Sequence, residues 1–137
     1  MYVLCSEVLT INIRKNTNII GFRINQNGHE HKESIYADDL GVVTTTEDSM
    51  QELFNLFEKY QLASNSKINK DKMEALWLGN WIGRTDKPLG LNWTNEEVKF
   101  LGVYIGNDRK RASMITFNEI PDKIKLKISC WNKKTYL

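Results

Sequence analysis

Two tight-turn signals in the first third of the chain constrain its fold more than any other feature. The first is Asn25-Gln26-Asn27-Gly28, which lies between residues 19–24 and residues 31–36. Asn and Gly tolerate the positive φ angles that a tight hairpin corner requires. This segment therefore predicts a β-hairpin whose strands are residues 19–24 and 31–36.

The second turn signal is the acidic pair Asp38-Asp39. Aspartate is common in turns, and the flanking residues 34–37 and 40–45 include β-branched and aromatic side chains that favour strands. We expect a second hairpin with these two segments as its strands and Asp38-Asp39 as its corner.

Apolar residues at helical spacing predict two helices around these hairpins. The first is a short amphipathic helix near the start, with Leu4, Val8 and Ile11 on its apolar face. The second runs from Glu47 to about residue 63, with Thr46 as its N-cap. Its apolar stripe consists of Met50, Leu53, Phe54, Phe57 and Tyr60.

The rest of the chain gives weaker signals. After a polar turn at residues 64–66, residues 73–78 are apolar apart from Glu74 and predict a strand buried on both faces or nearly so, and residues 80–95 predict a loop. Residues 98–105 have a strand pattern interrupted by Gly102, which in a strand often marks a bulge or a close backbone approach. A final amphipathic helix is expected from Pro121 onward, with Ile124, Ile128 and Trp131 on its apolar face.

Antiparallel strands joined by tight turns, with helices to cover one face, indicate an α+β fold. Within it, Phe57 on the helical stripe and Trp77 in the apolar strand are predicted core residues. The chain of 137 residues with 41% hydrophobic residues is long enough for one domain with its own core.

Composition also excludes several classes of protein. No apolar run approaches the roughly 20 residues that span a bilayer, and the start lacks the order of a signal peptide, so we expect a cytoplasmic or nuclear protein without a membrane partner. Cys5 and Cys130 lack the paired spacing of a zinc site, and His29 and His31 have no cysteine near them.

Positive charge is concentrated near the C-terminus. Residues 1–98 hold 10 lysines and arginines against 14 acidic residues, whereas residues 99–137 hold 9 against 3. This basic C-terminal third predicts either contact with a phosphate backbone or a solvated helix face.

Two adjacent carboxylates at a hairpin tip suit a divalent cation. Mg²⁺ prefers octahedral oxygen ligands and is usually held by one or two carboxylates together with substrate phosphates. The alternative interpretation of Asp38-Asp39 is an ordinary acidic β-turn.

Four sequence blocks in a fixed order favour the metal site. Tyr36-Ala37-Asp38-Asp39 resembles the Tyr/Phe-x-Asp-Asp signature of reverse transcriptases. Three further blocks are similar to those that follow this signature in non-LTR retrotransposon enzymes: residues 46–60 resemble the next helix, residues 67–75 resemble the lysine-isoleucine-asparagine block, and residues 100–106 resemble the Phe-Leu-Gly primer-grip hairpin. Trp131 resembles the tryptophan that opens the thumb.

The resemblance implies a palm-type antiparallel sheet with covering helices over residues 1–106, and a connection and thumb start over residues 107–137. It implies that Asp38 is a metal ligand and that Asp39 lies beside it, closer to the primer end. Ala37 would line the nucleotide sugar, and Tyr36 would pack beneath the primer and template.

The other implied site residues lie further along the chain. Lys72 matches a lysine that faces the leaving pyrophosphate, although a surface lysine fits the sequence equally well. Phe100, Leu101 and Gly102 would hold the primer 3′ end. The implied cofactor is Mg²⁺, with Mn²⁺ as the alternative, and the implied partners are an RNA template, a DNA primer and dNTPs.

The sequence departs from the family pattern in three places. Asn65-Ser66 stand where Gly-Leu is usual, and Met73 replaces a Ser or Thr. The third departure is an absence. The family's first catalytic Asp and its fingers lie upstream of the matching blocks, and no residue of this sequence corresponds to them. We therefore expect a fragment of an RNA-directed DNA polymerase that is inactive alone, or else a degenerate nucleic-acid-binding remnant or domesticated interaction module.

Overall fold

The computed structural model describes residues 2–25, 28–37 and 39–134, and the side chains of residues 7–25, 28–37 and 39–131. The chain divides into two compact units, Met1–Asn69 and Lys70–Leu137. The first contains helices α1 (Tyr2–Lys15) and α2 (Glu47–Ser64) and strands β1 (Phe22–Arg23), β2 (Glu30–His31), β3 (Glu33–Tyr36) and β4 (Asp39–Val42). The second contains β5 (Glu74–Leu76), β6 (Asn92–Thr94), β7 (Glu97–Phe100), β8 (Val103–Gly106) and helix α3 (Arg109–Lys134).

Helix α2 forms where the sequence predicts it. The Thr46 hydroxyl accepts a hydrogen bond from the Ser49 amide and caps its first turn, and Asn65 ends it at φ 53°. Glycine is the usual residue at such a left-handed position, and Asn is among the few others that tolerate it. Asn65 therefore preserves the turn that the family pattern assigns to glycine.

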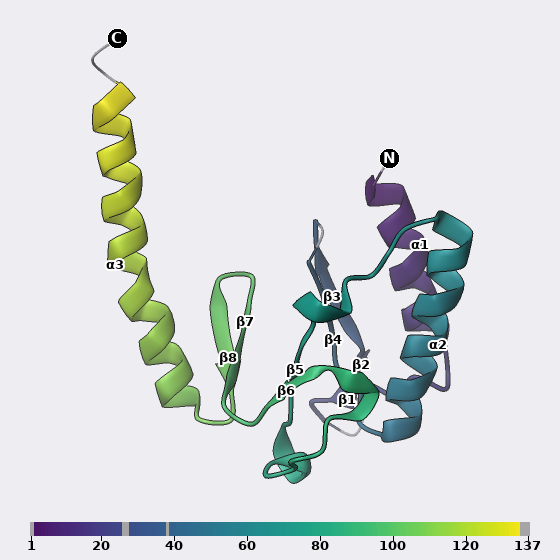
Figure 1. Ribbon diagram of the computed structural model, residues 1–137. Coiled ribbons are helices and arrows are strands. Elements are labelled where there is room, and N and C mark those ends of the chain that lie inside the picture. The colour runs from purple at the N-terminus through teal and green to yellow at the C-terminus, as the bar shows by residue number, and fades with distance from the viewer. Residues whose placement is uncertain (1, 26–27, 38, 135–137) are drawn as a thin grey trace. The chain divides into compact units, whose positions relative to one another are not determined.

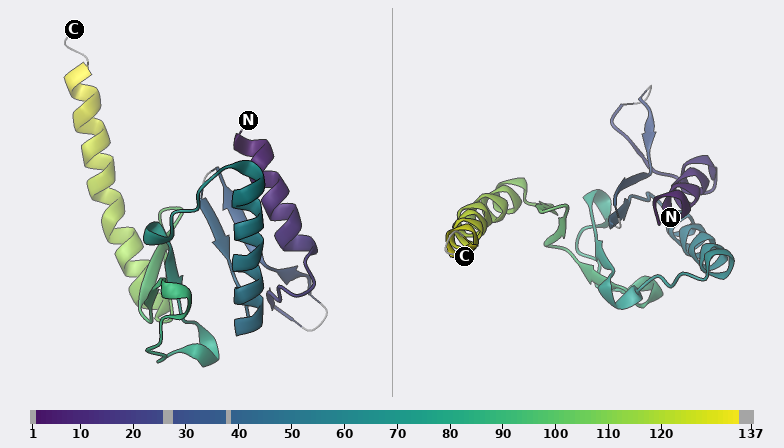
Figure 2. Two further views of the ribbon diagram at one scale, coloured as in Figure 1. Left: turned by 45° about the vertical axis from the view of Figure 1, so that its right-hand side comes forward. Right: turned by 90° about the horizontal axis from the view of Figure 1, so that it is seen from above.

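The core of the first unit lies between α1 and α2, which run side by side (Figures 1 and 2). Phe57 is 5% exposed, which confirms it as a core residue, and its ring meets that of Phe54 edge to face at 5.5 Å between centroids. The other buried apolar residues of this unit are Leu9, Ile13, Ile19, Met50 and Leu53.

The predicted apolar face of α1 is wrong in its described part. Val8 and Ile11 are exposed, whereas Leu9, Thr10 and Ile13 are buried. The helix carries apolar residues on more than one side, so periodicity alone does not select the buried face. Contacts with α2 and β3 select it instead.

Buried polar groups link the segments of this unit. The Ser49 hydroxyl is fully buried, donates to the Asn18 carbonyl at 2.9 Å and accepts from the Ile20 amide at 2.8 Å. The Lys32 ammonium is also buried and donates to the Asn16 carbonyl at 2.7 Å, so it satisfies a carbonyl just beyond the end of α1. Buried donors and acceptors need such partners, because unpaired ones are costly.

Both predicted hairpins of this unit are present, with shorter strands than expected. β1 pairs antiparallel with β2, and the Gly28 amide donates to the Asn25 carbonyl at 3.0 Å. The predicted strand at residues 31–36 divides at Lys32, because β2 pairs with β1 whereas β3 pairs with β4.

The second unit departs further from the prediction. The strand expected at residues 73–78 covers only Glu74–Leu76 and is not buried on both faces, since Glu74 is exposed. Its partner β6 lies in the segment predicted as a loop, and the two strands are parallel rather than antiparallel. The long connection between them is what a parallel pair requires. Trp77 is 6% exposed, which confirms its predicted place in the core.

Helix α3 begins at Arg109, well before the predicted start at Pro121, which lies inside the helix. The Asp108 carboxylate accepts hydrogen bonds from the Lys110 and Arg111 amides at 3.0 Å each and so caps the first turn. Pro121 removes one helical hydrogen bond but does not end the helix. Figure 2 shows the β7–β8 hairpin beside the N-terminal part of α3, while the C-terminal part extends beyond it.

The observed architecture is α+β, as the sequence predicts, but the described residues form four separate two-stranded sheets. In the part of the chain that the structure describes, no helix is long and apolar enough to cross a membrane.

Replacing Ser49 by Ala tests the buried hydroxyl. It leaves the Ile20 amide without its partner, so we expect the free energy of unfolding to fall by about 1–3 kcal/mol. Urea denaturation followed by circular dichroism measures this change. Ser113→Ala, at an exposed position on α3, should change stability by less than about 0.5 kcal/mol, and an equal loss in both variants would contradict the assignment.

Candidate functional site

The β3–β4 hairpin carries the predicted metal-binding sequence. Its register pairs Tyr36 with Asp39, so β3 ends at Tyr36 and Ala37 begins the corner. The corner is therefore shifted by one residue from the predicted Asp38-Asp39, and Asp39 is the first residue of β4. Ala37 has φ 52°, the left-handed value that the first position of a two-residue hairpin corner requires.

The end of this hairpin is open to solvent. Tyr36 is 71% exposed, and both Ala37 and Asp39 are exposed. No described residue forms an ion pair with the Asp39 carboxylate. A metal site at this tip requires exposed carboxylates; Asp39 meets this requirement, whereas Asp38 lies outside the described residues.

The base of the hairpin is fixed to helix α1. The Arg14 guanidinium donates to the Glu33 carboxylate from Nη2 at 2.6 Å and from Nε at 3.0 Å. The Glu33 side chain is only 8% exposed, so this ion pair is partly shielded from water. At the other strand, the Val43 amide donates to the Lys32 carbonyl at 2.8 Å. The hairpin thus has an anchored base and an exposed tip.

The chemistry of this tip suits a hard cation. Carboxylate oxygens that are exposed and free of competing ion pairs are the ligands that Mg²⁺ and Mn²⁺ accept, and Asp39 offers them. Among the described side chains, no three His, Cys, Asp or Glu residues gather into a group that could hold a metal ion.

Lys72, the predicted partner of the leaving pyrophosphate, belongs to the second unit. It ends the short 3₁₀ turn Lys70–Lys72, and its side chain is exposed. Exposure fits both interpretations of Lys72, so the pyrophosphate partner and the ordinary surface residue both stay predictions.

The β7–β8 hairpin carries Phe100, Leu101 and Gly102. Phe100 pairs with Val103, so Leu101 and Gly102 form the corner, at φ 51° and 82°. Positive φ at both positions is the requirement of a type I′ turn. Gly102 was predicted to mark a bulge or a close backbone approach within one strand. It is instead the second corner residue of a hairpin.

A polar cluster fixes this hairpin to α3, and sequence reasoning did not find it. The Glu119 carboxylate accepts hydrogen bonds from Lys99 Nζ at 2.5 Å and from Tyr104 Oη at 2.6 Å, and it pairs with Lys123 Nζ at 2.8 Å. Lys99 and Tyr104 are opposite each other across β7 and β8. The sequence shows Glu119 only as one of 3 acidic residues among the 9 lysines and arginines of residues 99–137, which does not reveal its partners.

These donors stabilise the charged form of Glu119. The hydrogen bonds from Lys123, then Lys99, then Tyr104 lower the pKa of Glu119 from 4.5 to about 2. The same contact with Glu119 raises the pKa of the Tyr104 hydroxyl. The hairpin is thus attached to the helix by a charge that is present throughout the neutral pH range.

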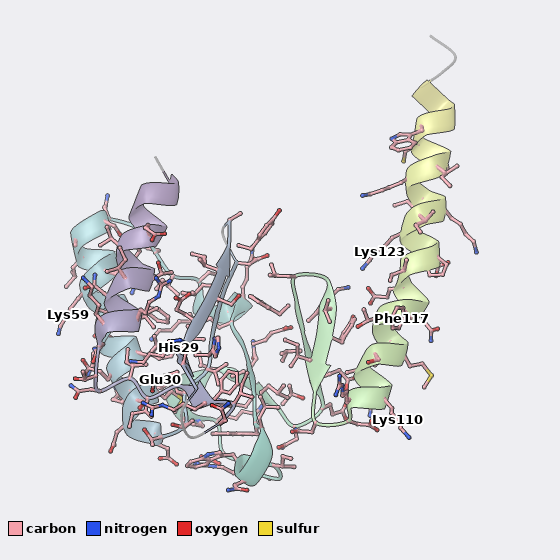
Figure 3. All side chains as sticks on the ribbon, turned by 180° about the vertical axis from the view of Figure 1, so that it is seen from behind. His29, Glu30, Lys59, Lys110, Phe117 and Lys123 are labelled. Atoms are coloured by element: carbon pink, nitrogen blue, oxygen red, sulfur yellow. The ribbon has the colours of Figure 1, made fainter. Side chains whose placement is uncertain are left out.

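The C-terminal part of α3 is a candidate nucleic-acid surface. Every described side chain from Pro121 to Trp131 is exposed. Lys110, Phe117 and Lys123 lie at successive levels of this helix (Figure 3), and Lys123 and Lys125 form ion pairs within it. Both predicted uses of this basic segment, phosphate contact and a solvated face, are compatible with that exposure.

No protein-family model matches the chain, and no curated protein is significantly similar to it.

Ala37→Gly tests the left-handed corner of the β3–β4 hairpin. Glycine adopts positive φ without the steric penalty of Cβ, so we expect the free energy of unfolding to rise by about 1 kcal/mol. Ala63→Gly, near the end of α2, is the matched control and should lower it by up to about 1 kcal/mol. Chemical denaturation of the two variants checks the opposite signs, and a loss of stability in both would contradict a left-handed Ala37.

Glu119→Gln tests the charged anchor of the β7–β8 hairpin. Because folding lowers the pKa of Glu119, its stabilising effect is complete above pH 4.5 and is lost as the pH falls toward 2. We expect the unfolding midpoint, followed by tryptophan fluorescence, to fall less steeply in the variant across this window. Identical acid limbs in the variant and the unchanged chain would contradict the anchor.

Proposed function

We propose that this chain is part of an RNA-directed DNA polymerase of the non-LTR retrotransposon kind. It would contain the carboxylate-bearing hairpin of the palm, the primer-holding hairpin and the start of the thumb. The observation that carries the proposal is the β3–β4 hairpin, in which the Tyr36-Ala37-Asp38-Asp39 sequence coincides with a solvent-exposed end and an exposed Asp39 carboxylate.

In this proposal Asp38 and Asp39 hold Mg²⁺ or Mn²⁺. The metal would supply stabilisation of the charge that develops when the primer 3′-hydroxyl attacks a dNTP. The chain's own contribution is position: the Arg14–Glu33 ion pair and the pairing of β3 with β4 hold the base of the hairpin, and Asp39 at its other end is exposed. Tyr36, at 71% exposed, offers a ring against which nucleic acid can pack.

The β7–β8 hairpin would hold the primer 3′ end. Its corner, Leu101-Gly102, is exposed, and a Cβ built on Gly102 would meet no atom within 4 Å. A bare backbone at an exposed corner lets a strand of nucleic acid approach closely. The Glu119 cluster supports this role, because it fixes the orientation of the hairpin on α3.

A second candidate function is nucleic-acid binding without catalysis. It is favoured by α3, whose described side chains beyond Ile120 are all exposed and include Lys123, Lys125 and Lys127. Binding through these lysines would release counterions from the phosphates, so its affinity would fall steeply with salt.

The metal proposal is tested with Mn²⁺ in NMR spectra of the ¹⁵N-labelled chain. We expect Mn²⁺ to broaden the amide signals of Ala37, Asp39 and Leu40 selectively, because a bound paramagnetic ion relaxes nearby nuclei. Asp38→Asn combined with Asp39→Asn should abolish this broadening. The matched control is Glu47→Gln with Asp48→Asn, which neutralises the other adjacent acidic pair in the first turn of α2 and should leave it unchanged. Equal broadening at both pairs would sink the metal site.

Primer extension tests whether the chain alone is catalytic. Two carboxylates should hold metal more weakly than the three that the resemblance implies, so we expect the chain alone to bind an RNA–DNA hybrid weakly and to extend no primer with Mg²⁺ and dNTPs. Asp38→Ala is the control for contaminating polymerase. Extension that depends on Asp38 would show that these two carboxylates suffice, contrary to this expectation.

A further inference from the structure

The second unit contains an open cavity of about 400 Å³ that lies apart in sequence from both hairpin tips. It is bordered by the loop that follows the 3₁₀ turn Gly79–Trp81 and by the segment that runs through the end of β6. Its lining includes Arg84, Asp86, Lys87, Trp93, Asn95 and Glu96. Neither the metal site nor the primer-holding hairpin uses this cavity.

Trp93 lines the cavity, and its ring is held in place by two contacts. The Trp93 ring stacks on Trp77 with 3.7 Å between centroids and 15° between planes, and its Nε1 donates to the Pro88 carbonyl at 3.0 Å. Trp93 as a whole is half-buried. A fixed, partly exposed indole favours stacking with a planar ring.

The charged side chains that line the cavity are paired except at Lys87. Arg84 binds Asp86 through Nε at 2.8 Å and through Nη2 at 2.5 Å, and these hydrogen bonds lower the pKa of the Asp86 carboxyl. Glu96 pairs at 3.0 Å with Arg111, which also pairs with Glu97 at 3.1 Å. The Lys87 ammonium has no ion-pair partner among the described residues, so it is the charged group of the lining that can meet an anion.

The remaining polar group can recognise a base edge. The Asn95 amide is oriented by two hydrogen bonds, because its Oδ1 accepts from the Gly83 amide at 2.8 Å and its Nδ2 donates to the Arg84 carbonyl at 2.9 Å. Each end of that amide keeps one further hydrogen-bonding position. A fixed donor and acceptor beside an aromatic ring match the edge of a nucleobase.

We propose that this cavity binds a nucleotide, with its base stacked on Trp93 and its phosphate facing Lys87. The volume falls within the roughly 300–1,000 Å³ of ligand pockets. The inference goes beyond the proposed polymerase function and does not depend on it, because none of its residues belongs to the two hairpin tips.

The test follows the indole N–H signals of the 4 tryptophans in NMR spectra of the ¹⁵N-labelled full chain, titrated with uridine 5′-monophosphate. We expect a saturable shift of the Trp93 signal and none of the Trp131 signal on α3. Lys87→Gln should weaken binding about fivefold, as loss of one partly exposed charge contact does, and Lys87→Arg should restore it. Lys110→Gln, at an exposed lysine on α3, should have no effect.

Further probes identify the source of the nucleotide and the outcomes that reject the site. A short single-stranded oligouridylate that binds more tightly than the mononucleotide indicates a nucleic-acid strand, and equal binding indicates a free nucleotide; both support the site. Inorganic phosphate that shifts Trp93 as strongly as the nucleotide would overturn base recognition. So would the absence of a saturable shift up to about 10 mM nucleotide, or equal effects of Lys87→Gln and Lys110→Gln.

Discussion

Left-handed backbone at two hairpin corners is the constraint on which the candidate sites of this chain depend. A two-residue corner matches the right-handed twist of the strands that it joins only if its first residue has positive φ. Ala37 and Leu101 both meet this condition without being glycine. Each carries a steric cost that the surrounding structure must offset, and residues held in this way are often found at functional sites.

Polar anchors hold both hairpins to helices. Arg14 and Glu33 join α1 to β3 at the base of its hairpin, and Lys99, Tyr104 and Glu119 join β7 and β8 to α3 near the corner of theirs. In both places an ion pair joins the hairpin to a helix, while the described corner residues are exposed. Such an arrangement restricts the strands and leaves the corner free to meet a ligand, which is what the proposed polymerase roles of Asp39 and Gly102 need.

Sequence reasoning succeeded where one local signal decided the structure. Thr46 and the apolar stripe through Phe57 specify α2 without help from tertiary contacts, and Asn65 supplies the left-handed end that the helix requires. The two tight-turn signals likewise located both hairpins of the first unit. The second corner was misplaced by one residue, because turn propensity favours two aspartates whereas strand register assigns Asp39 to β4.

The errors share a physical cause, namely that packing or a cap outweighed local preference. The buried face of α1 is selected by α2 and β3, and the parallel pairing of β5 with β6 depends on a partner distant in sequence. Asp108, a favourable N-cap residue, could have predicted the start of α3. The prediction instead placed the start at Pro121, because proline is common in the first turn of a helix. The Glu119 cluster could not be predicted, because its members come from three elements.

The register of the β3–β4 hairpin is the most direct test of this account. NMR can measure it through the amide–amide NOE between residues that flank a two-residue corner, together with the coupling constant that reports φ at residue 37. The account predicts an NOE between Tyr36 and Asp39 and a positive φ at Ala37. An NOE between Ala37 and Leu40, with Ala37 in an extended conformation, would instead put both aspartates in the corner and contradict the account.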